Sequence, residues 1–254
     1  MFETILITGG TGKVGSQLLQ HFYSKNFNVI FTALTSDEAN KTIDKIKQPN
    51  KKNLIKSIIV DLMQEDSHRQ ITTNLEQLKI FPEFLINCAR SLSFLKVNDD
   101  GITMRPEWLG EFTLDVVVPY ELSMALANHK KTNLKSIIII SSIYGIVPFN
   151  PNLYINPQKD SPIQYSIAKS AQIQLTKELA IRLASQNISV NAVSFGGIEG
   201  RVDEEFKRRY AQLCPIKRML KIEEITPAVD FLICSHTQTI TGHNLVADGG
   251  WSIW

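Results

Sequence analysis

Apolar residues occur along the chain in short continuous runs, separated by stretches that are long enough for helices. A continuous run rich in β-branched residues is typical of a strand buried on both faces of a sheet. The pattern predicts seven strands, over residues 5–8, 29–33, 57–61, 84–87, 136–141, 188–194 and 245–247. Between them, apolar residues return at helical spacing, as at Val14, Leu18 and Phe22, and a long helix is expected over residues 162–185.

Alternating strands and helices predict an α/β protein with a doubly wound, seven-stranded parallel sheet and helices on both faces, which is a Rossmann fold. No linker, repeat or low-complexity tract interrupts the pattern, so we expect a single domain over residues 1–254. The proline-rich stretch 147–162 is expected to be an ordered loop on the rim of the sheet.

Composition narrows the class of protein. The 254 residues include 27 Lys plus Arg and 25 Asp plus Glu, and the basic residues are dispersed, so a nucleic-acid partner is not expected. Apolar runs are too short to span a bilayer and the chain does not start like a signal peptide, which favours a cytoplasmic protein without a membrane partner. The three Cys and five His show no ligand spacing, so no metal site is expected.

After the first predicted strand, the stretch Thr8-Gly9-Gly10-Thr11-Gly12-Lys13-Val14-Gly15 places glycines three residues apart at Gly9, Gly12 and Gly15. A turn without side chains lets a pyrophosphate approach the backbone and lie at the N-terminus of the next helix, where free N–H groups favour anions. Tight packing alone also explains such glycines, but their place after the first strand favours a nucleotide site. The candidate cofactor contacts here are Gly9, Thr11, Gly12, Lys13, Val14 and Gly15.

The second predicted strand ends without an acid that would hold ribose hydroxyls. Asp37 and Glu38 follow Thr35 at capping-box spacing, which explains them as acids of a first helical turn. An uncharged strand end does not repel a 2′-phosphate, so NADP is favoured and NAD is the alternative. The side chains that can contact that phosphate are Lys13, Thr32, Thr35 and Ser36.

Tyr165 and Lys169 lie four residues apart, on one face of the long predicted helix. A free tyrosine has a pKa of about 10, and a nearby ammonium group favours the phenolate and brings that pKa toward neutrality. Tyr165 is therefore the candidate general acid for reduction, or base for oxidation. Ser142 ends the fifth strand, at the edge where parallel sheets bind ligands, and is the candidate hydrogen-bond donor to the substrate oxygen.

In this order, the motifs resemble those of the short-chain dehydrogenase/reductase family over essentially the whole chain. The resemblance also covers Asn87-Cys88-Ala89, residues 191–197 and residues 247–250. It implies that Lys169 holds the nicotinamide ribose, that the substrate is a small molecule and that the protein is a homodimer or homotetramer. Further cofactor contacts implied by the resemblance are Asp61, Leu62, Asn87, Ala89, Gly196 and Ile198.

Three residues depart from the family pattern: Arg90 and Phe195 replace a glycine and a proline, and Asp115 occupies the slot of a proton-relay asparagine. An ionised aspartate accepts hydrogen bonds but does not donate them. Asp115 is thus either a fourth member of the catalytic set or a surface acid.

Two segments of the chain bear on the substrate. The loop 143–164 contains Tyr144 and Tyr154 among several asparagines, which suits a sugar derivative, although any turn contains asparagines. The loop also resembles that of oxidoreductases in bacterial surface-glycan and flagellin-sugar pathways. Residues 197–221 resemble the family's substrate lid, and their basic side chains either bind an acidic substrate or form a solvated helix. Those side chains are Arg201, Lys207, Arg208, Arg209 and Arg218.

The predicted function is hydride transfer between NADP(H) and a carbonyl or secondary alcohol, on a sugar or sugar-derived substrate. Two alternatives remain open. Sugar-nucleotide epimerases and dehydratases share the 9, 12, 15 glycine spacing, and the three departures leave room for a non-catalytic NAD(P)-binding sensor or scaffold. At the C-terminus, Trp251 and Trp254 are expected to be exposed on a monomer and to be covered at a subunit interface.

Overall fold

The computed structural model describes residues 2–46, 52–200, 202–234 and 238–254. Seven parallel strands form one sheet in the order β3-β2-β1-β4-β5-β6-β7, which confirms the predicted fold. The strands are β1 (Thr4–Ile7), β2 (Asn28–Ala33), β3 (Ile55–Ile59), β4 (Phe84–Asn87), β5 (Ser136–Ser142), β6 (Ser189–Phe195) and β7 (Asn244–Ala247).

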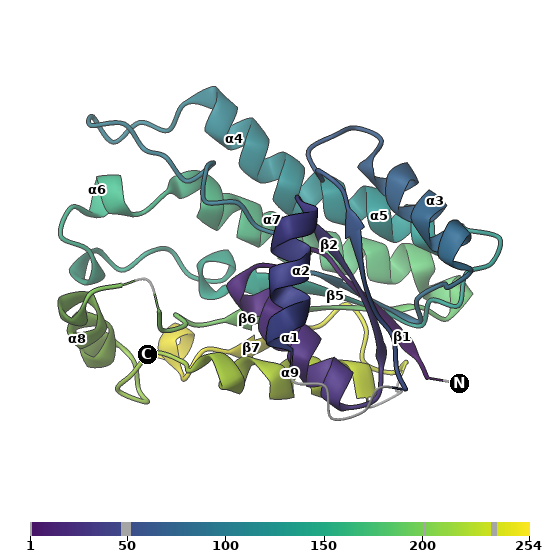
Figure 1. Cartoon of the computed structure of the whole chain (residues 1–254). Helices are drawn as coiled ribbons and strands as arrows, with labels where there is room; N and C mark the ends of the chain where they lie inside the picture. Colours follow the sequence, from purple (N-terminus) through teal and green to yellow (C-terminus); the bar gives the residue numbers. More distant parts are fainter. Residues whose placement is uncertain (1, 47–51, 201, 235–237) are drawn as a thin grey trace.

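Helices cover both faces of the sheet (Figure 1). One face is packed by α1 (Lys13–Ser24), α2 (Ser36–Lys45) and α9 (Thr226–Cys234). The other is packed by α3 (Ser67–Leu78), α5 (Val118–Ala127) and α7 (Ile163–Leu183), with α4 (Arg105–Phe112) against α7. The short helix α6 (Pro157–Asp160) and the helix α8 (Glu204–Leu213) lie at the end of the sheet away from the N-terminus (Figure 1). Short 3-10 turns are η2 (Ile143–Gly145), η3 (Pro151–Leu153), η4 (Ala184–Gln186), η5 (Ile222–Ile225) and η6 (Trp251–Ile253).

Burial on both faces explains the continuous apolar runs. In β1, Ile5 and Ile7 belong to the core under α1, and Leu6 belongs to the core on the opposite face. Successive side chains of a strand point to opposite faces, so a strand with helices on both sides needs apolar residues at every position.

The predicted boundaries are least accurate at the sheet edge. β3 begins at Ile55, two residues before the predicted start, and Lys56 and Ile59 on it are exposed. An edge strand with one exposed face does not carry the continuous apolar signal of a central strand. The long helix begins one residue later than predicted, because Pro162 has extended backbone angles and is the N-cap of α7.

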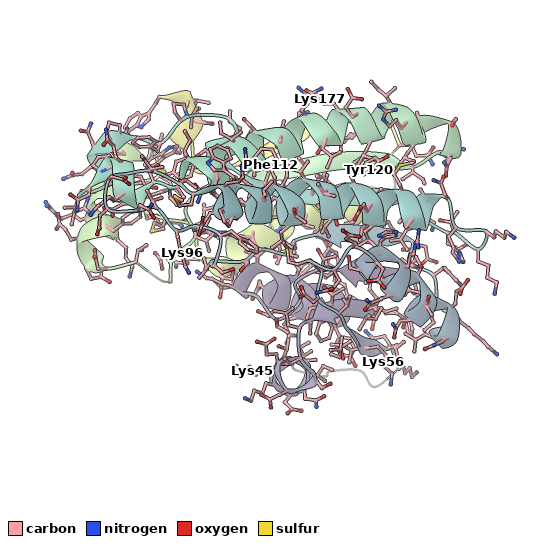
Figure 2. All side chains as sticks on the ribbon, turned by 90° about the horizontal axis from the view of Figure 1, so that it is seen from above. Lys45, Lys56, Lys96, Phe112, Tyr120 and Lys177 are labelled. Carbon is pink, nitrogen blue, oxygen red and sulfur yellow. The ribbon has the colours of Figure 1, made fainter. Side chains whose placement is uncertain are left out.

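Helices α4 and α5 form one continuous helical column, with a wider, π-helical turn between them. Helix α4 continues into a π-helical turn, η1 (Thr113–Val117), and then into α5. Figure 2 shows this column running alongside α7. A π-turn accommodates one extra residue and often occurs at functional sites. Here it contains Asp115.

The ends of β1 and β4 are joined by one side chain. Thr8 is 2% exposed, and its Oγ1 accepts hydrogen bonds from the backbone N–H groups of Cys88 and Ala89 at 3.0 and 3.1 Å. This contact holds the glycine turn next to the loop that follows β4.

Replacing Thr8 with valine keeps the shape of the side chain but leaves both N–H groups without an acceptor. We expect Thr8→Val to lower the free energy of unfolding by about 2 kcal/mol, measured by urea denaturation. Thr73 is exposed on α3 and provides the control. Equal stability of Thr8→Val and Thr73→Val would show that the Thr8 contact contributes nothing.

Candidate active site

Close contacts within the chain require glycine at two of the three positions 9, 12 and 15 after β1. Gly9 has a φ of 67°, and a Cβ there would lie 2.6 Å from the Cα of Ala89. A Cβ on Gly15 would collide with the carbonyl oxygen of Gly9. Packing therefore explains these two glycines without a ligand.

Gly12 is different, because a Cβ there would meet only the Gly9 carbonyl oxygen, at 3.3 Å. It is the N-cap of α1, its φ of −71° suits any residue, and it makes no side-chain capping bond. Within the described residues, packing therefore requires glycine less strongly at position 12 than at positions 9 and 15. A pyrophosphate that approaches the first turn of α1 supplies a further reason for glycine there.

Thr32 has a structural role that the sequence did not reveal. It is 2% exposed, and its Oγ1 accepts a hydrogen bond from the Gly9 N–H at 2.9 Å. The hydroxyl therefore supports the glycine turn from inside the protein, and the phosphate contact of Thr32 stays a prediction. Thr35 caps α2 by accepting from the Glu38 N–H, as the capping-box spacing predicts.

The other predicted cofactor contacts lie around the same edge of the sheet. Asp61 is exposed after β3, and its Oδ1 accepts from the Met63 N–H at 2.9 Å, whereas the side chain of Leu62 is in the core. Asn87 at the end of β4 is 3% exposed, and neither its Oδ1 nor its Nδ2 has a hydrogen-bond partner. A buried amide without partners fits a polar ligand group beside it.

The segment that follows β6, where the predicted lid begins, contacts the helix that follows β1. Lys13 on α1 donates a hydrogen bond to the carbonyl of Ile198 at 3.4 Å. Gly196 follows β6, and its N–H donates to the Ala247 carbonyl. Phe195 extends β6 by one residue beyond the predicted end and is 4% exposed in the core.

A close approach of η2 to α7 brings the catalytic candidates together. A Cβ on Gly145 would lie 2.7 Å from the Lys169 carbonyl oxygen, so only glycine permits this contact. Ser141 Oγ donates to the same carbonyl at 3.0 Å. Ser142 Oγ accepts from the Tyr144 N–H at 3.2 Å, which leaves its hydroxyl hydrogen available to a substrate oxygen.

Lys169 and Asp115 form a buried ion pair. They are 4% and 1% exposed, and Lys169 Nζ lies 2.9 Å from Asp115 Oδ2. Lys169 Nζ also donates to the Ile140 carbonyl and to Gln172 Oε1, at 3.3 and 3.1 Å. Burial lowers the pKa of Lys169, but the Asp115 carboxylate and Tyr165 more than offset it, and the pKa lies above its usual value. Asp115 is thus not a surface acid.

Two cations flank the ring of Tyr165, in the first turn of α7. The Arg90 guanidinium carbon lies 4.5 Å from the ring centroid, and Lys169 Nζ lies 5.5 Å from it. Tyr144 packs edge-on against the same ring, with the centroids 6.4 Å apart. Positive charges near a phenol favour its ionised form. The sequence marks Arg90 as a departure from the family pattern but does not predict this contact.

Glu111 is a member of the site that the sequence analysis missed. It lies on α4 four residues before Asp115 and is 1% exposed. Burial is the main cause that raises the pKa of Glu111 to about 7, and the Asp115 charge adds to it, whereas Lys169 and Arg90 oppose it. The four-residue spacing of two acids on one helix was the available signal.

The substrate loop and the lid are linked by aromatic side chains. The hydroxyl groups of Tyr144 and Tyr154 are 2.6 Å apart, and Tyr154 packs on Phe206 of α8 with the centroids 5.8 Å apart. Burial raises the pKa of both tyrosines. Arg209 Nε donates to the Leu153 carbonyl at 2.7 Å, which also connects α8 to the loop.

Four of the predicted basic residues of the lid pair with acids of the lid or just beyond it. Lys207 pairs with Glu204, Arg208 and Arg209 pair with Glu205, and Arg218 pairs with Glu224. This favours the solvated-helix interpretation over an anion-binding lid. Arg201 lies outside the described residues.

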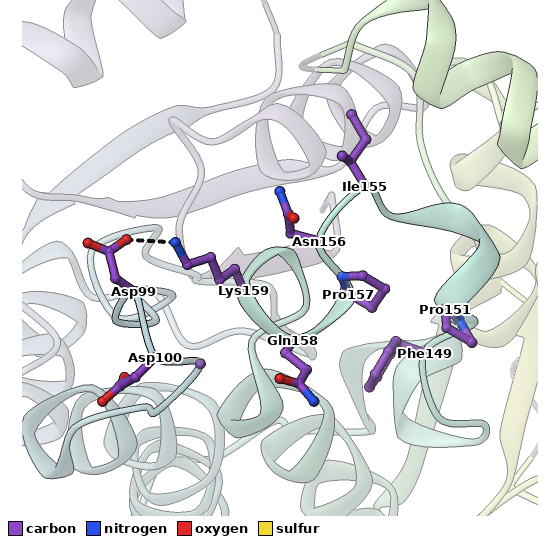
Figure 3. Close-up of a pocket in the computed structure, with 10 residues that line it drawn as sticks. Asp99, Asp100, Phe149, Pro151, Ile155, Asn156, Pro157, Gln158 and Lys159 are labelled. Carbon is purple, nitrogen blue, oxygen red and sulfur yellow. Dashed lines mark hydrogen bonds and ion pairs between the residues drawn. The ribbon is translucent and has the colours of Figure 1, made fainter.

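A cavity of about 540 Å³ lies at the outer end of the substrate loop (Figure 3). It is bounded by residues 99–101 and by the loop from Phe149 to Lys159, where Lys159 pairs with Asp99 at 2.7 Å. Phe149 packs on Tyr154, with 6.2 Å between the ring centroids. Neither Tyr165 nor Ser142 lines this cavity, so it lies beyond the catalytic side chains.

At the C-terminus, the expectation of two exposed tryptophans is wrong for Trp251. It is 6% exposed and stacks on Tyr210 with a centroid distance of 4.4 Å. Trp254 is 69% exposed. Within the described residues, no helix is long and apolar enough to cross a membrane, and no group of three or more His, Cys, Asp or Glu can hold a metal ion.

Comparison with known proteins identifies the family of this chain. The family profile described as enoyl-(acyl carrier protein) reductase matches residues 13–252. A solved short-chain dehydrogenase from Leptospira borgpetersenii with bound NAD⁺ is 28% identical, with a TM-score of 0.83 over 100% of this chain and 94% of that chain. The chain belongs to the short-chain dehydrogenase/reductase family.

Two curated relatives differ in how much of the chain they match. Glucose 1-dehydrogenase 2 of Bacillus subtilis (strain 168) is 25% identical over 99% of this chain and 95% of that protein. Post-translational flagellin modification protein A of Campylobacter coli is 34% identical, over 49% of this chain and 48% of that protein. The second likeness thus covers only half of the chain.

This short-chain dehydrogenase/reductase is an NAD(P)-dependent oxidoreductase, and the alternative of a non-catalytic sensor is not supported. The described residues fit the cofactor at three points. Gly12 has no side chain in the way of a pyrophosphate, Asn87 offers a buried amide without partners, and Lys169 Nζ lies 5.5 Å from the Tyr165 ring centroid.

Alanine at Gly12 is expected to weaken cofactor binding without unfolding the protein. A methyl group there displaces the pyrophosphate, and the loss of charge-assisted hydrogen bonds raises the Kd for NAD(P)H about tenfold or more. Fluorescence titration measures the Kd. Alanine at Gly15 is the contrasting variant, because overpacking against Gly9 lowers stability. Unchanged binding in Gly12→Ala would contradict a pyrophosphate position at this turn.

Proposed function

We propose that this short-chain dehydrogenase/reductase interconverts a carbonyl compound and a secondary alcohol with NADP(H), with Tyr165 carrying the proton. The observation behind this proposal is the cationic surroundings of the Tyr165 ring, whose centroid lies 4.5 Å from the Arg90 guanidinium carbon and 5.5 Å from Lys169 Nζ. A phenol held beside an ammonium group is placed to pass its proton to a substrate oxygen.

Each side chain has a distinct task in this proposal. The bound nicotinamide supplies the hydride to the carbonyl carbon, or accepts it in the reverse direction. Ser142 donates a hydrogen bond to the substrate oxygen as negative charge develops on it, and Tyr165 delivers a proton to the same oxygen. Asp115 holds the Lys169 ammonium beside Tyr165, since it is the carboxylate paired with it at 2.9 Å.

Preference for NADP rests on the end of β2. No acid stands there to repel a 2′-phosphate, and Thr35 and Ser36 lie at the start of α2, where helix N–H groups favour anions. Lys13 at the start of α1 is the cation that the sequence offers, and in this structure its Nζ donates to the Ile198 carbonyl at 3.4 Å. Thr32 is buried, and its hydroxyl, which accepts from the Gly9 N–H, still has a hydrogen to donate.

Cofactor preference can be measured without knowing the substrate. Titration of the purified protein with NADPH and NADH, followed by nicotinamide fluorescence, is expected to give a lower Kd for NADPH. The 2′-phosphate would add charge-assisted hydrogen bonds, each worth about 1.5–3 kcal/mol. A lower Kd for NADH would reverse the assignment.

A sugar-derived substrate is supported by the chemistry of the substrate loop. Tyr144 and Tyr154 present two hydroxyl groups and two aromatic rings close to Tyr165. Rings of this kind pack on the apolar face of a sugar while hydroxyl groups pair with its oxygens. Glucose 1-dehydrogenase 2 carries a sugar in its name, and the half-chain likeness to a flagellin modification protein adds the surface-glycan context.

The protein is proposed to act as a homodimer or homotetramer. Exposed apolar side chains on α4 and α7, such as Leu109 at 62% and Ile163 at 55%, are costly to leave in water. Ile253 and Trp254 at the C-terminus are exposed as well, at 84% and 69%. A symmetric assembly that covers such residues is the common solution for identical chains.

Phenylalanine at position 165 tests the catalytic assignment. Tyr165→Phe removes the proton-carrying hydroxyl and keeps the ring between Arg90 and Lys169, so turnover of keto sugars is expected to fall at least about 100-fold. The Kd for NADPH is expected to change little. Full activity of this variant would refute the mechanism, and conversion without net oxidation of the cofactor would support epimerase chemistry instead.

A further inference from the structure

Two buried carboxylic acids share the helical column beside Lys169. Glu111 and Asp115 are each 1% exposed. Glu111 Oε1 and Asp115 Oδ2 are both buried and accept no hydrogen bond of ordinary geometry from the described residues, although Asp115 Oδ2 is 2.9 Å from Lys169 Nζ. Two buried carboxylate groups, each with one oxygen that lacks a hydrogen-bond donor of ordinary geometry, are unfavourable as a pair of anions.

The charges facing Glu111 come from three segments. Asp115 on η1 disfavours its ionisation, and Lys169 on α7 and Arg90 after β4 favour it. On the same helix, Glu107 lies one turn earlier with its Oε2 buried. Cys88 also neighbours Lys169 and Asp115, but burial raises the pKa of its thiol to about 12, so it stays neutral.

Lys169 and Arg90 both act on this cluster, but of the two acids only Asp115 has a cation of the described residues within ion-pair distance, so burial favours the protonated form of Glu111. Asp115 is paired directly with Lys169, so a proton retained by the two acids belongs to Glu111. The pKa of about 7 for Glu111 is consistent with this assignment and lets the proton leave and return near neutral pH.

We propose that Glu111 is the internal proton reservoir of the active site, which refills Tyr165 through Asp115 and Lys169 after each reduction. This inference rests on the proposed function of Tyr165. Glu111 does not touch the substrate in this scheme and is a positioning residue that acts through Lys169.

The proton transfers balance in four steps. Tyr165 gives its phenolic proton to the substrate oxygen and becomes a phenolate. The Lys169 ammonium returns a proton to the phenolate and becomes an amine. The carboxylic acid of Glu111 passes its proton, by way of the Asp115 carboxylate, to that amine. The Glu111 carboxylate then recovers a proton from solvent, so each reduction consumes one proton.

A route to solvent exists along the same helix. Glu107 is only partly buried, and it precedes Glu111 by four residues toward the exposed start of α4, where Arg105 and Pro106 lie at the surface. Acids at positions 107, 111 and 115 follow the spacing at which residues of one helix face are neighbours.

The first measurement uses the protein without cofactor. Carboxyl ¹³C NMR of glutamate-labelled protein is expected to show one resonance that titrates near pH 7 and is missing in Glu111→Gln. Glu178 on α7 is about half exposed and paired with Arg182, so Glu178→Gln is the matched control and should keep that resonance. Titration of Glu111 below pH 5 would overturn the proposal.

The second measurement is the pH profile of kcat for reduction. In the unmodified protein kcat is expected to fall as the pH rises through 7, because the reservoir is then ionised. In Glu111→Gln kcat is expected to be about tenfold lower at pH 6 and flat between pH 6 and 8, while Glu111→Asp restores the slope. Thermal unfolding confirms that the variants are folded.

The two measurements separate the inference from the function on which it rests. Should no carbonyl compound be turned over, the proposed function fails, yet NMR titration near pH 7 still supports a proton held by Glu111. Turnover in Glu111→Gln with an unchanged pH profile would overturn the reservoir while leaving the role of Tyr165 intact.

Discussion

The buried ammonium group of Lys169 needs hydrogen-bond acceptors and an opposite charge, and the arrangement of the site depends on them. Removing a charge from water costs several kcal/mol, and only well-placed partners offset this cost. Lys169 obtains them from three elements: the Ile140 carbonyl of β5, Asp115 of η1 and Gln172 of α7 itself. The strand, the π-turn and the long helix must therefore meet at one point. The same meeting brings Ser142 and Tyr165 to one edge of the sheet.

The fold was largely predictable because the relevant forces act locally in the sequence. Burial on both faces produces continuous apolar runs, so β4 was located at its observed ends, whereas the edge strand β3 was displaced by two residues. Capping of α2 by Thr35 followed from spacing alone. Such signals need no knowledge of distant residues.

Most residues of the site were predictable from the sequence, but the contacts between them were not. Tyr165, Lys169 and Asp115 were identified, yet the ion pair joins residues 115 and 169, and the Arg90 contact with Tyr165 joins segments equally remote. The burial of Trp251 was missed for the same reason, because its contact with Tyr210 is set by packing, and so was the hydrogen bond from the Gly9 N–H to Thr32. Basic residues of the lid suggested an anion site until their pairing with neighbouring acids was visible.

The π-turn at Thr113–Val117 makes this region sensitive to length. An α-helix advances about 100° per residue, so removal of a single residue from the wide turn would restore regular helix geometry. Everything on the far side would then rotate by about that angle. Asp115 would leave the buried ammonium group, and the Asp115 carbonyl would lose the Gln172 Nε2 donor that it has at 2.8 Å. Substitutions can be absorbed here by neighbouring side chains, but a one-residue deletion cannot, and related chains that differ in length at this helix are expected to differ in chemistry too.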